Sequence, residues 1–310
     1  MIKKRMALLA QLSMVVLLSV ATAWGAGGLS QISEAVYAYT NIKSQSPGNR
    51  FGANAGIVIG DDGLLVVDTL TTAKEAALFL ADIRKITDKP VRYVINTHYH
   101  LDHAFGNCVF ADMGAMVISH TACRGKLLSI KDQALEGAKS LGLDDAALEG
   151  TRIVVPTMAF EQKLELDLGH RVVQLLYSGY ESHTAGSIFV WIPDQKVVFA
   201  GDTLFTDFHP YLAEGNLKGW AKTLDELLAL GAEKIIPGHG PLSGAKEVQE
   251  MKAYLTVFDH HARSLCATST DIDQITAEMT KRLPPRADGQ FLIKANIQVR
   301  YLSPPKQKEN

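Results

Sequence analysis

The sequence contains little cysteine, with only Cys108, Cys123 and Cys266 in 310 residues. None of the three belongs to a Cys-x-x-Cys pair, so no cysteine-based metal or redox motif is expected. The odd count allows one disulfide at most, and no spacing indicates which two residues would pair. We interpret all three as small buried apolar residues.

An excess of charge of one sign is also missing. The 31 Lys and Arg residues and 33 Asp and Glu residues give a formal net charge of -2, and the basic residues are scattered along the chain. This argues against a nucleic-acid partner, which requires a basic patch. Residues 50–300 contain no Pro/Gly/Ser-rich linker, low-complexity tract or internal repeat. We therefore expect one globular domain over residues 24–310 that ends in a helical segment.

A long apolar run occurs only at the beginning of the chain. Three basic residues, Lys3 to Arg5, precede the mainly apolar segment 6–23, which ends in Ala21-Thr22-Ala23. This order is typical of a secretory signal peptide over residues 1–23, cleaved before Trp24. The alternative is an uncleaved anchor, because about 20 apolar residues can span a bilayer. We favour cleavage, and expect an exported protein, periplasmic or secreted, without stable membrane insertion.

The hydrophobic pattern predicts strands and helices in two β-rich halves. A hairpin over residues 57–67 turns at 60–63, a helix follows over 72–87, and a strand over 91–96 ends at a group of histidines. Further strands are expected near 116 and over 153–176, 187–192, 196–200 and 234–236. Further helices are expected from 104, over 121–149 with turns between them, over 217–230, and from 245 to the end apart from breaks near 268 and 284–285. The predicted architecture is an α/β (α+β) sandwich of two sheets covered by helices on both outer faces.

The segment 98–103 has the pattern His-x-His-x-Asp-His. In extended backbone, residues two apart point the same way, so His98 and His100 can bind one metal ion. A turn at the intervening leucine then lets Asp102 and His103 face a second ion. Such a dense group of metal-binding side chains predicts a metal site.

Three more potential ligands occur beside small residues. They are His183 in Ser-His-Thr-Ala-Gly-Ser, Asp202 in Gly-Asp-Thr and His239 in Pro-Gly-His-Gly. Glycine permits the tight turns that bring a ligand close to an ion. We expect all these ligands to follow directly after strands.

In their order, these four motifs resemble those of the metallo-β-lactamase superfamily over about residues 50–245 of the chain. The resemblance implies a four-layer αββα fold and a metal-dependent hydrolase with two zinc ions per chain, iron or manganese being the alternatives. It also implies that His98, His100 and His183 bind the first ion, that Asp102, His103 and His239 bind the second, and that Asp202 bridges the two.

Imidazole and carboxylate ligands suit zinc, which tolerates changes of coordination during a reaction. Two ions about 3.5 to 4 Å apart lower the pKa of a shared water and polarise a carbonyl group. We expect a metal-bound hydroxide, oriented by Asp102, to hydrolyse an ester, thioester, lactone or amide bond of a small-molecule substrate. No protein nucleophile is needed, and no Gly-x-Ser-x-Gly motif is present.

Two residues that follow Asp202, His209 and Tyr211, are predicted to contact the substrate, because loops beside a rigid metal site often line its pocket. Simple packing is the equal alternative for both. The remaining histidines have no motif around them, and we expect no function for them: His120, His170, His260 and His261.

The predicted bridging aspartate resembles the glyoxalase II, lactonase and phosphodiesterase branches of the superfamily. With the export signal, Phe105-Gly106-Asn107 and His209-Pro210-Tyr211 resemble exported zinc hydrolases associated with quinoprotein or sulfur-oxidation systems. A mononuclear iron sulfur dioxygenase of the same fold, using His98, His183 and Asp202, is one alternative. A non-catalytic periplasmic protein that binds a metal or another ligand is the other. Metal content and oxygen uptake would separate these possibilities.

Overall fold

The computed structural model describes residues 28–40 and 51–303, and the predicted signal peptide lies outside them. Among the described residues, the strands form two sheets. The first contains, in spatial order, β1 (Ser30–Gln31), β2 (Val36–Ala38), β3 (Gly56–Ile59), β4 (Leu64–Val67), β5 (Val91–Ile95), β6 (Met116–His120) and β7 (Met158–Phe160). The second contains β12 (Lys234–His239), β11 (Val197–Phe205), β10 (Ile188–Ile192), β9 (Val172–Tyr177) and β8 (Lys163–Asp167).

The helices are distributed between these strands and the C-terminal part of the described chain. They are α1 (Ala73–Arg84), α2 (Leu101–Ala104), α3 (Asn107–Ala111), α4 (Thr121–Ile130), α5 (Ala134–Ser140), α6 (Asp145–Leu148), α7 (Leu217–Ala229), α8 (Ala245–Cys266), α9 (Ile272–Arg282), α10 (Gln290–Asn296) and a π-helix (Ile297–Leu302).

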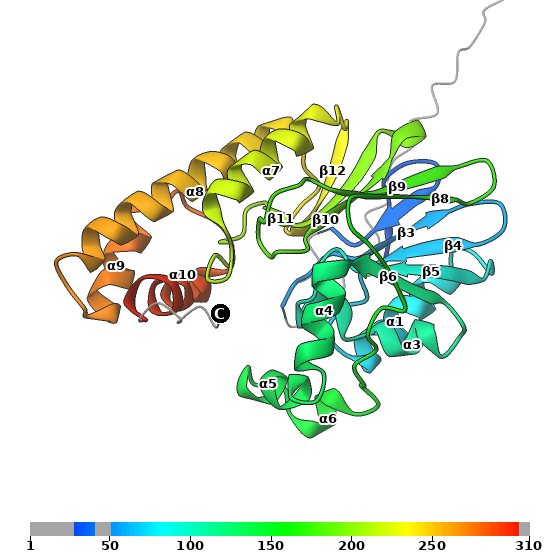
Figure 1. Cartoon of the computed structure of the whole chain (residues 1–310), viewed down its shortest axis with the longest axis horizontal. Helices are drawn as coiled ribbons and strands as arrows, with labels where there is room; N and C mark the ends of the chain where they lie inside the picture. The colour runs from blue at the N-terminus through cyan, green and yellow to red at the C-terminus, as the bar shows by residue number, and fades with distance from the viewer. Residues whose placement is uncertain (1–27, 41–50, 304–310) are drawn as a thin grey trace, which may run out of the picture.

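The two sheets pack face to face and bury a core of side chains from both. Val58, Leu65 and Ile95 of the first sheet share this core with Leu175 and Val190 of the second. Helices α1 and α3 cover the outer face of the first sheet, and α7 and α8 cover the outer face of the second (Figure 1). The predicted fold, a four-layer αββα sandwich, is confirmed.

Strand pairing brings the ends of β5, β11 and β12 to one edge of the sandwich. Strands β4 to β7 run parallel, as do β11 and β12. Because parallel strands end at the same edge of a sheet, the loops that follow them lie close together. All five residues of β10 and all nine of β11 are buried, as expected of strands covered on both faces.

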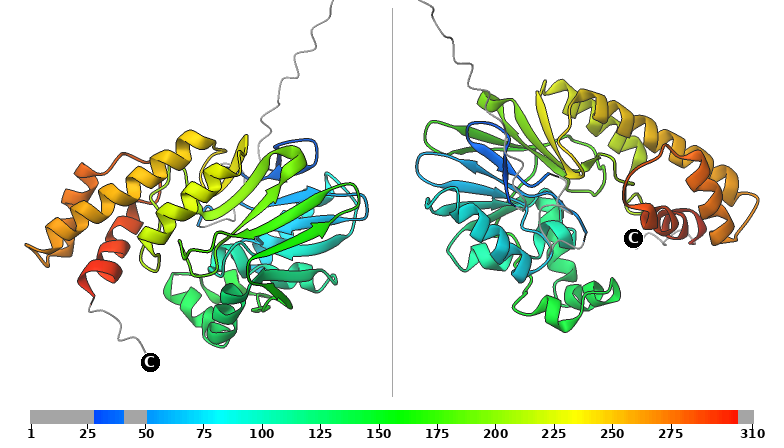
Figure 2. Two further views of the ribbon diagram at one scale, coloured as in Figure 1. Left: turned by 45° about the horizontal axis from the view of Figure 1, so that its top comes forward. Right: turned by 180° about the vertical axis from the view of Figure 1, so that it is seen from behind.

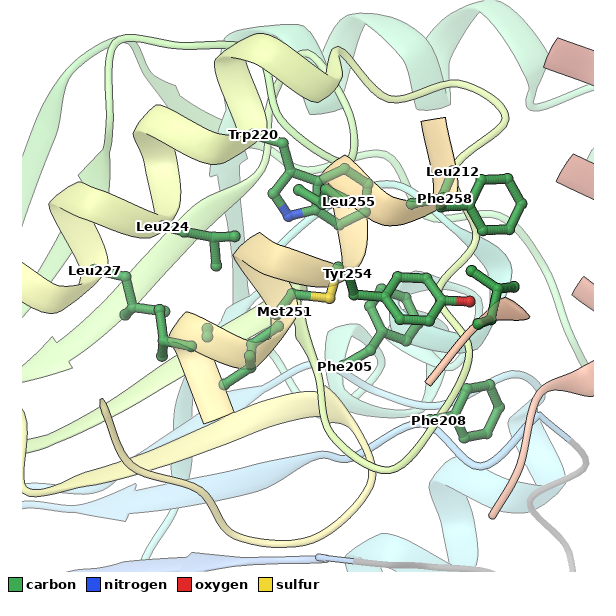
Figure 3. Close-up of a cluster of buried hydrophobic side chains, with 14 of the residues drawn as sticks. Phe205, Phe208, Leu212, Trp220, Leu224, Leu227, Met251, Tyr254, Leu255 and Phe258 are labelled. Carbon is green, nitrogen blue, oxygen red and sulfur yellow. The ribbon is translucent and has the colours of Figure 1, made fainter. Parts of the chain in front are cut away.

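Helices α8 to α10 form an arm that leaves the sandwich and turns back toward it (Figures 1 and 2). The side of α8 next to the sandwich packs against α7 and the chain after β11. Figure 3 shows this cluster, in which Trp220, Tyr254 and Phe258 meet Phe205 and Leu212. The chain after β11 is therefore enclosed between the second sheet and the arm.

Three elements differ from the predictions in a way that matters for the metal ligands. Strand β11 continues past Ala200 to Phe205, and β12 continues past Ile236 to His239. Asp202 and His239 thus lie within strands, whereas the sequence predicted that they follow them. The helix predicted from residue 104 is two short helices, α2 and α3, and α2 begins inside the histidine motif.

The three cysteines are free, with Cys108 and Cys123 buried. The interpretation as small buried residues holds for these two, whereas Cys266 is only partly buried. In the described ranges, no helix combines the length and the apolar character needed to cross a membrane.

Candidate metal centre

The seven predicted ligands come together at the edge where β5, β11 and β12 end. Four of them follow β5, His183 lies between β9 and β10, and the other two lie in β11 and β12. They form two groups, and within each group the potential ligand atoms lie within 4.8 Å of one another. The first group is His98, His100, His183 and Asp202; the second is Asp102, His103 and His239.

In the first group, three imidazoles surround one point. His100 Nδ1 lies 3.1 Å from His98 Nε2 and 2.8 Å from His183 Nε2. Asp202 Oδ2 lies 3.2 Å from His183 Nε2. Residues 97–100 form a bend rather than the extended segment assumed from the sequence, and His100 is the N-cap of α2. The two histidines therefore converge through a turn of the backbone.

The second group lies on the other side of the Asp202 carboxylate. Asp202 Oδ1 is 3.1 Å from His103 Nε2 and 3.4 Å from His239 Nε2. Asp102 Oδ2 is 3.4 Å from His239 Nε2. The two oxygens of one carboxylate thus face different groups.

The electrostatics of the first group provide neutral donors for a cation. Burial lowers the pKa of His98 well below its usual value, and His103 adds to the effect. Burial together with the nearby His183 lowers the pKa of His100 to about 3. Burial also lowers the pKa of His183, to about 4, against the attraction of Asp202. A neutral imidazole is the form that binds a metal.

In the second group, the buried carboxylates favour positive charge beside them. Burial alone would lower the pKa of His103, but the surrounding carboxylates, first Asp202 and then Asp102, raise it well above its usual value. The same competition raises the pKa of His239 to about 9. The histidines in turn outweigh burial and hold the pKa of Asp202 far below its usual value. This demand for positive charge fits a metal ion, which would displace the protons.

Two buried atoms at this point support the same conclusion. His103 Nε2 and Asp202 Oδ1 lack a hydrogen-bond partner among the described residues, although they lie 3.1 Å apart. Buried polar atoms are normally paired, and an unpaired one needs an explanation. Coordination of a divalent ion explains both atoms, so the donor set fits the metal that the motifs predict.

Asp68, which sequence reasoning missed, supports the second group from behind. Its Oδ2 lies 2.8 Å from His103 Nδ1, and its two oxygens accept hydrogen bonds of 2.8 and 2.7 Å from the backbone N and Oγ1 of Thr97. The carboxylate thereby leaves His103 Nε2 to face the other ligands of the second group, as is usual for metal-binding histidines. The available sequence signal was an aspartate placed directly after the apolar strand 64–67.

Beside the first group lie two further residues that no motif indicated. The Tyr99 hydroxyl donates a hydrogen bond to Glu214. Glu214 Oε2 lies 3.7 Å from His100 Nε2. The half-buried ring of Tyr211 is centred 5.8 Å from the His100 ring, which places it beside the predicted first ion.

The structure places His209 on the side of the arm. Its ring is buried, and Nδ1 lies 2.6 Å from the Tyr254 hydroxyl of α8. Burial lowers the pKa of His209 to about 4. Tyr211 makes ring contacts with two of the ligands, His100 and His183, and substrate contact by either Tyr211 or His209 stays a prediction.

The other four histidines belong to neither group of ligands. His120 caps α4 and stacks on Tyr177, and His170 pairs with Asp61 at the surface. His260 and His261 are neighbours on α8.

Comparison with known proteins gives a consistent result. The family model described as the metallo-beta-lactamase superfamily matches residues 48–239, which is more than half of the chain. A linear primary-alkylsulfatase from a Pseudomonas strain is 26% identical over 61% of this chain and 42% of its own length. The metallo-beta-lactamase type 2 of Bacteroides fragilis is 23% identical over 72% of this chain and 83% of its own length.

Among solved structures, a metallo-beta-lactamase from Pontibacter korlensis has a similar fold. Its TM-score is 0.58 at 20% identity, covering 74% of this chain and 98% of that one. The predicted resemblance is confirmed, and the prediction of a metal-dependent hydrolase agrees with the superfamily and with the reactions for which the two relatives are named. The chain spans less than half of the alkylsulfatase.

Proposed function

The chain belongs to the metallo-beta-lactamase superfamily, and from this premise we propose that it is an exported hydrolase with two zinc ions in the centre described above. The observation that carries the proposal is the position of Asp202. Its Oδ2 lies 3.2 Å from a histidine of the first group, and its Oδ1 lies 3.1 Å from a histidine of the second. A carboxylate between two sets of imidazole donors suits a pair of divalent ions.

Bound divalent ions would supply an acidified water and positive charge for the oxygen that becomes negative in the transition state. The residues of the chain have separate tasks around that chemistry. His98, His100 and His183 would hold the first ion, and Asp102, His103 and His239 the second. The free oxygen of Asp102 would accept a hydrogen bond from the attacking water and so orient it.

The substrate we propose is a small molecule with an ester, thioester, lactone or amide bond. Tyr99, Tyr211 and Glu214 lie at the first group and would form part of its binding surface. The name of the alkylsulfatase relative adds sulfate esters to the classes to be tested. Elemental analysis of the purified mature protein, followed by assays of all five classes and of β-lactams, tests the proposal. Absence of bound metal and of hydrolysis in every assay would refute it.

The number of ions can be tested by removing ligands from the second group. We predict about two zinc equivalents in the wild type, and about one in His103→Ala and in His239→Ala, because the first group keeps its histidines in both variants. His170→Ala, which removes a surface imidazole, is the matched control and should keep two. One tightly bound iron per chain with uptake of oxygen would instead favour the sulfur dioxygenase.

A further inference from the structure

The metal-ligand candidate His183 is fixed in position by the chain that follows β11. Its Nδ1 lies 3.1 Å from the backbone oxygen of Tyr211, so Nδ1 donates and Nε2 is left with its lone pair toward the other ligands. The Trp220 ring, 5.2 Å away between centroids, packs beside the imidazole. The preceding residue, Ser182, accepts a hydrogen bond of 2.8 Å from the backbone N of Asn216. The direction of His183 Nε2 therefore depends on the chain from 210 to 216.

The segment 210–216 is in turn hydrogen-bonded to one buried side chain of the arm. Asn296, at the end of α10, is 0% exposed. Its Oδ1 accepts a hydrogen bond of 2.7 Å from the backbone N of Leu212, and its Nδ2 donates one of 2.8 Å to the backbone O of Pro210. The Leu212 N–H and the Tyr211 carbonyl belong to the same peptide group. One planar peptide group thus joins Asn296 on one side to His183 on the other.

A side chain just beyond α10 is hydrogen-bonded to the same segment. Arg300 lies in the π-helix, and its Nη1 donates to the backbone oxygens of Leu212 and Gly215 at 3.2 and 2.6 Å. The helix ends with a hydrogen bond of 2.9 Å from the Ser303 backbone N to the Gln298 backbone O, five residues back. Such wide turns are uncommon and often occur at functional sites.

The arm could pack against the segment after β11 without these buried polar groups. The apolar cluster of Figure 3 already joins Phe205 and Leu212 to α7 and α8. A buried amide costs free energy unless it is paired, and once paired it selects one arrangement of its partners. Asn296 pairs with the two peptide groups on either side of the Tyr211 α-carbon, which an apolar residue could not do.

We propose that Asn296, supported by Arg300, is a positioning residue that sets the orientation of His183 and hence the affinity of the first group for its divalent ion. The inference rests on the proposed metal centre. It assigns a role in the site to the C-terminal arm, which lies beyond residues 48–239 matched by the family model.

The test compares Asn296→Leu, which keeps the size of the side chain and removes both hydrogen bonds, with the wild type. We expect Asn296→Leu to bind the first zinc ion about tenfold more weakly, in the range found when partners behind metal-binding histidines are removed. Competition with a chromophoric chelator measures the affinity. The visible absorption of the cobalt(II)-substituted protein should also change, since it reports the geometry of the ligands.

The matched control is Ile297→Val, which disturbs the packing of the adjacent, 0% exposed residue and leaves every hydrogen bond to residues 210–215 intact. It should keep the wild-type zinc affinity and cobalt spectrum even if its melting temperature falls. If Asn296→Leu does not fold, the same measurements are made on Arg300→Met, which keeps the aliphatic stem of the side chain and removes its hydrogen-bond donors. Wild-type affinity in Asn296→Leu, or in Arg300→Met where only that variant folds, overturns this inference and leaves the metal centre standing. A wild-type protein that binds no divalent ion overturns both.

Discussion

At the scale of single residues, Asp102 has the most specific of the proposed tasks. Its side chain is 11% exposed, and Oδ2 lies 3.4 Å from His239 Nε2. We predict that Asp102→Asn loses most hydrolytic activity and keeps the first ion, because the amide removes the charge that binds the second ion and orients the water. A loss of about 3 to 5 kcal/mol in transition-state stabilisation corresponds to roughly a hundred- to several-thousandfold lower kcat/KM.

Steady-state kinetics and metal analysis of the same preparation measure both effects. Asp112→Asn changes an exposed aspartate that pairs with Arg152, and it should behave as the wild type. Near-normal turnover of Asp102→Asn would show that the assignment of the hydrolytic centre is wrong.

His209 gives a prediction about pH. Burial lowers its folded-state pKa to about 4, whereas an unfolded histidine titrates near 6.5. Between these values the unfolded chain binds a proton that the folded protein excludes, so this residue destabilises the fold as the pH falls from about 7 to 4. In metal-free protein, His209→Asn should therefore lose less melting temperature than the wild type between pH 7 and pH 4.5. Parallel curves for the two proteins would contradict this account.

The ligands themselves could be predicted from sequence because they occur in short motifs that carry their own chemistry. Asp68 and Asn296 could not, since each is a single polar residue without a motif. Their roles depend on hydrogen bonds to His103 and to Leu212, which are 35 and 84 positions away in the chain. Such partners are set by tertiary packing, and local pattern does not encode them.

At the scale of elements, strands β11 and β12 leave little space between Gly238 and the ligand Asp202. A Cβ on Gly238 would overlap Oδ1 of Asp202 and the adjacent backbone of β11. We predict that Gly238→Ala lowers stability by about 1 to 3 kcal/mol, as overpacking usually does, and also lowers the metal content. Chemical denaturation and elemental analysis measure the two effects.

Gly137→Ala is the control, because Gly137 lies in α5 with open space around it. This change should be neutral or slightly stabilising, since alanine is the better helix former. A Gly238→Ala protein as stable and as rich in metal as Gly137→Ala would show that the close approach is not needed.

Most strand positions were predicted, apart from β1 and β2, and strand ends were not. The apolar run 197–200 marked β11, but Gly201-Asp202 read as a turn, although the backbone continues in the sheet to Phe205. The reason is tertiary, because pairing with β12 resumes at Phe205 and His239 after an irregularity at Gly201. Gly201 and Asp202 would end an isolated strand, but pairing with the neighbouring strand β12 keeps them in the sheet.

At the scale of the whole molecule, the export prediction concerns residues outside the structure. We predict that the mature protein begins near Trp24 and is recovered from the periplasm or medium without detergent, because the basic, apolar and small-residue segments are those of a cleavable signal. N-terminal sequencing of the fractionated protein decides the matter. An intact Met1 terminus in the membrane fraction would contradict it.

Each group of ligands contains residues from both β-rich halves of the chain, and this affects the rates of folding and unfolding. His98 and His103 come from the chain after the first sheet's β5, whereas His183 and His239 come with the second sheet. Neither group can be complete until the two sheets have docked. We therefore expect most of the binding energy of an ion to be absent from the folding transition state. Interactions of this kind slow unfolding and leave the folding rate nearly unchanged, so bound ions would mainly extend the lifetime of the folded protein.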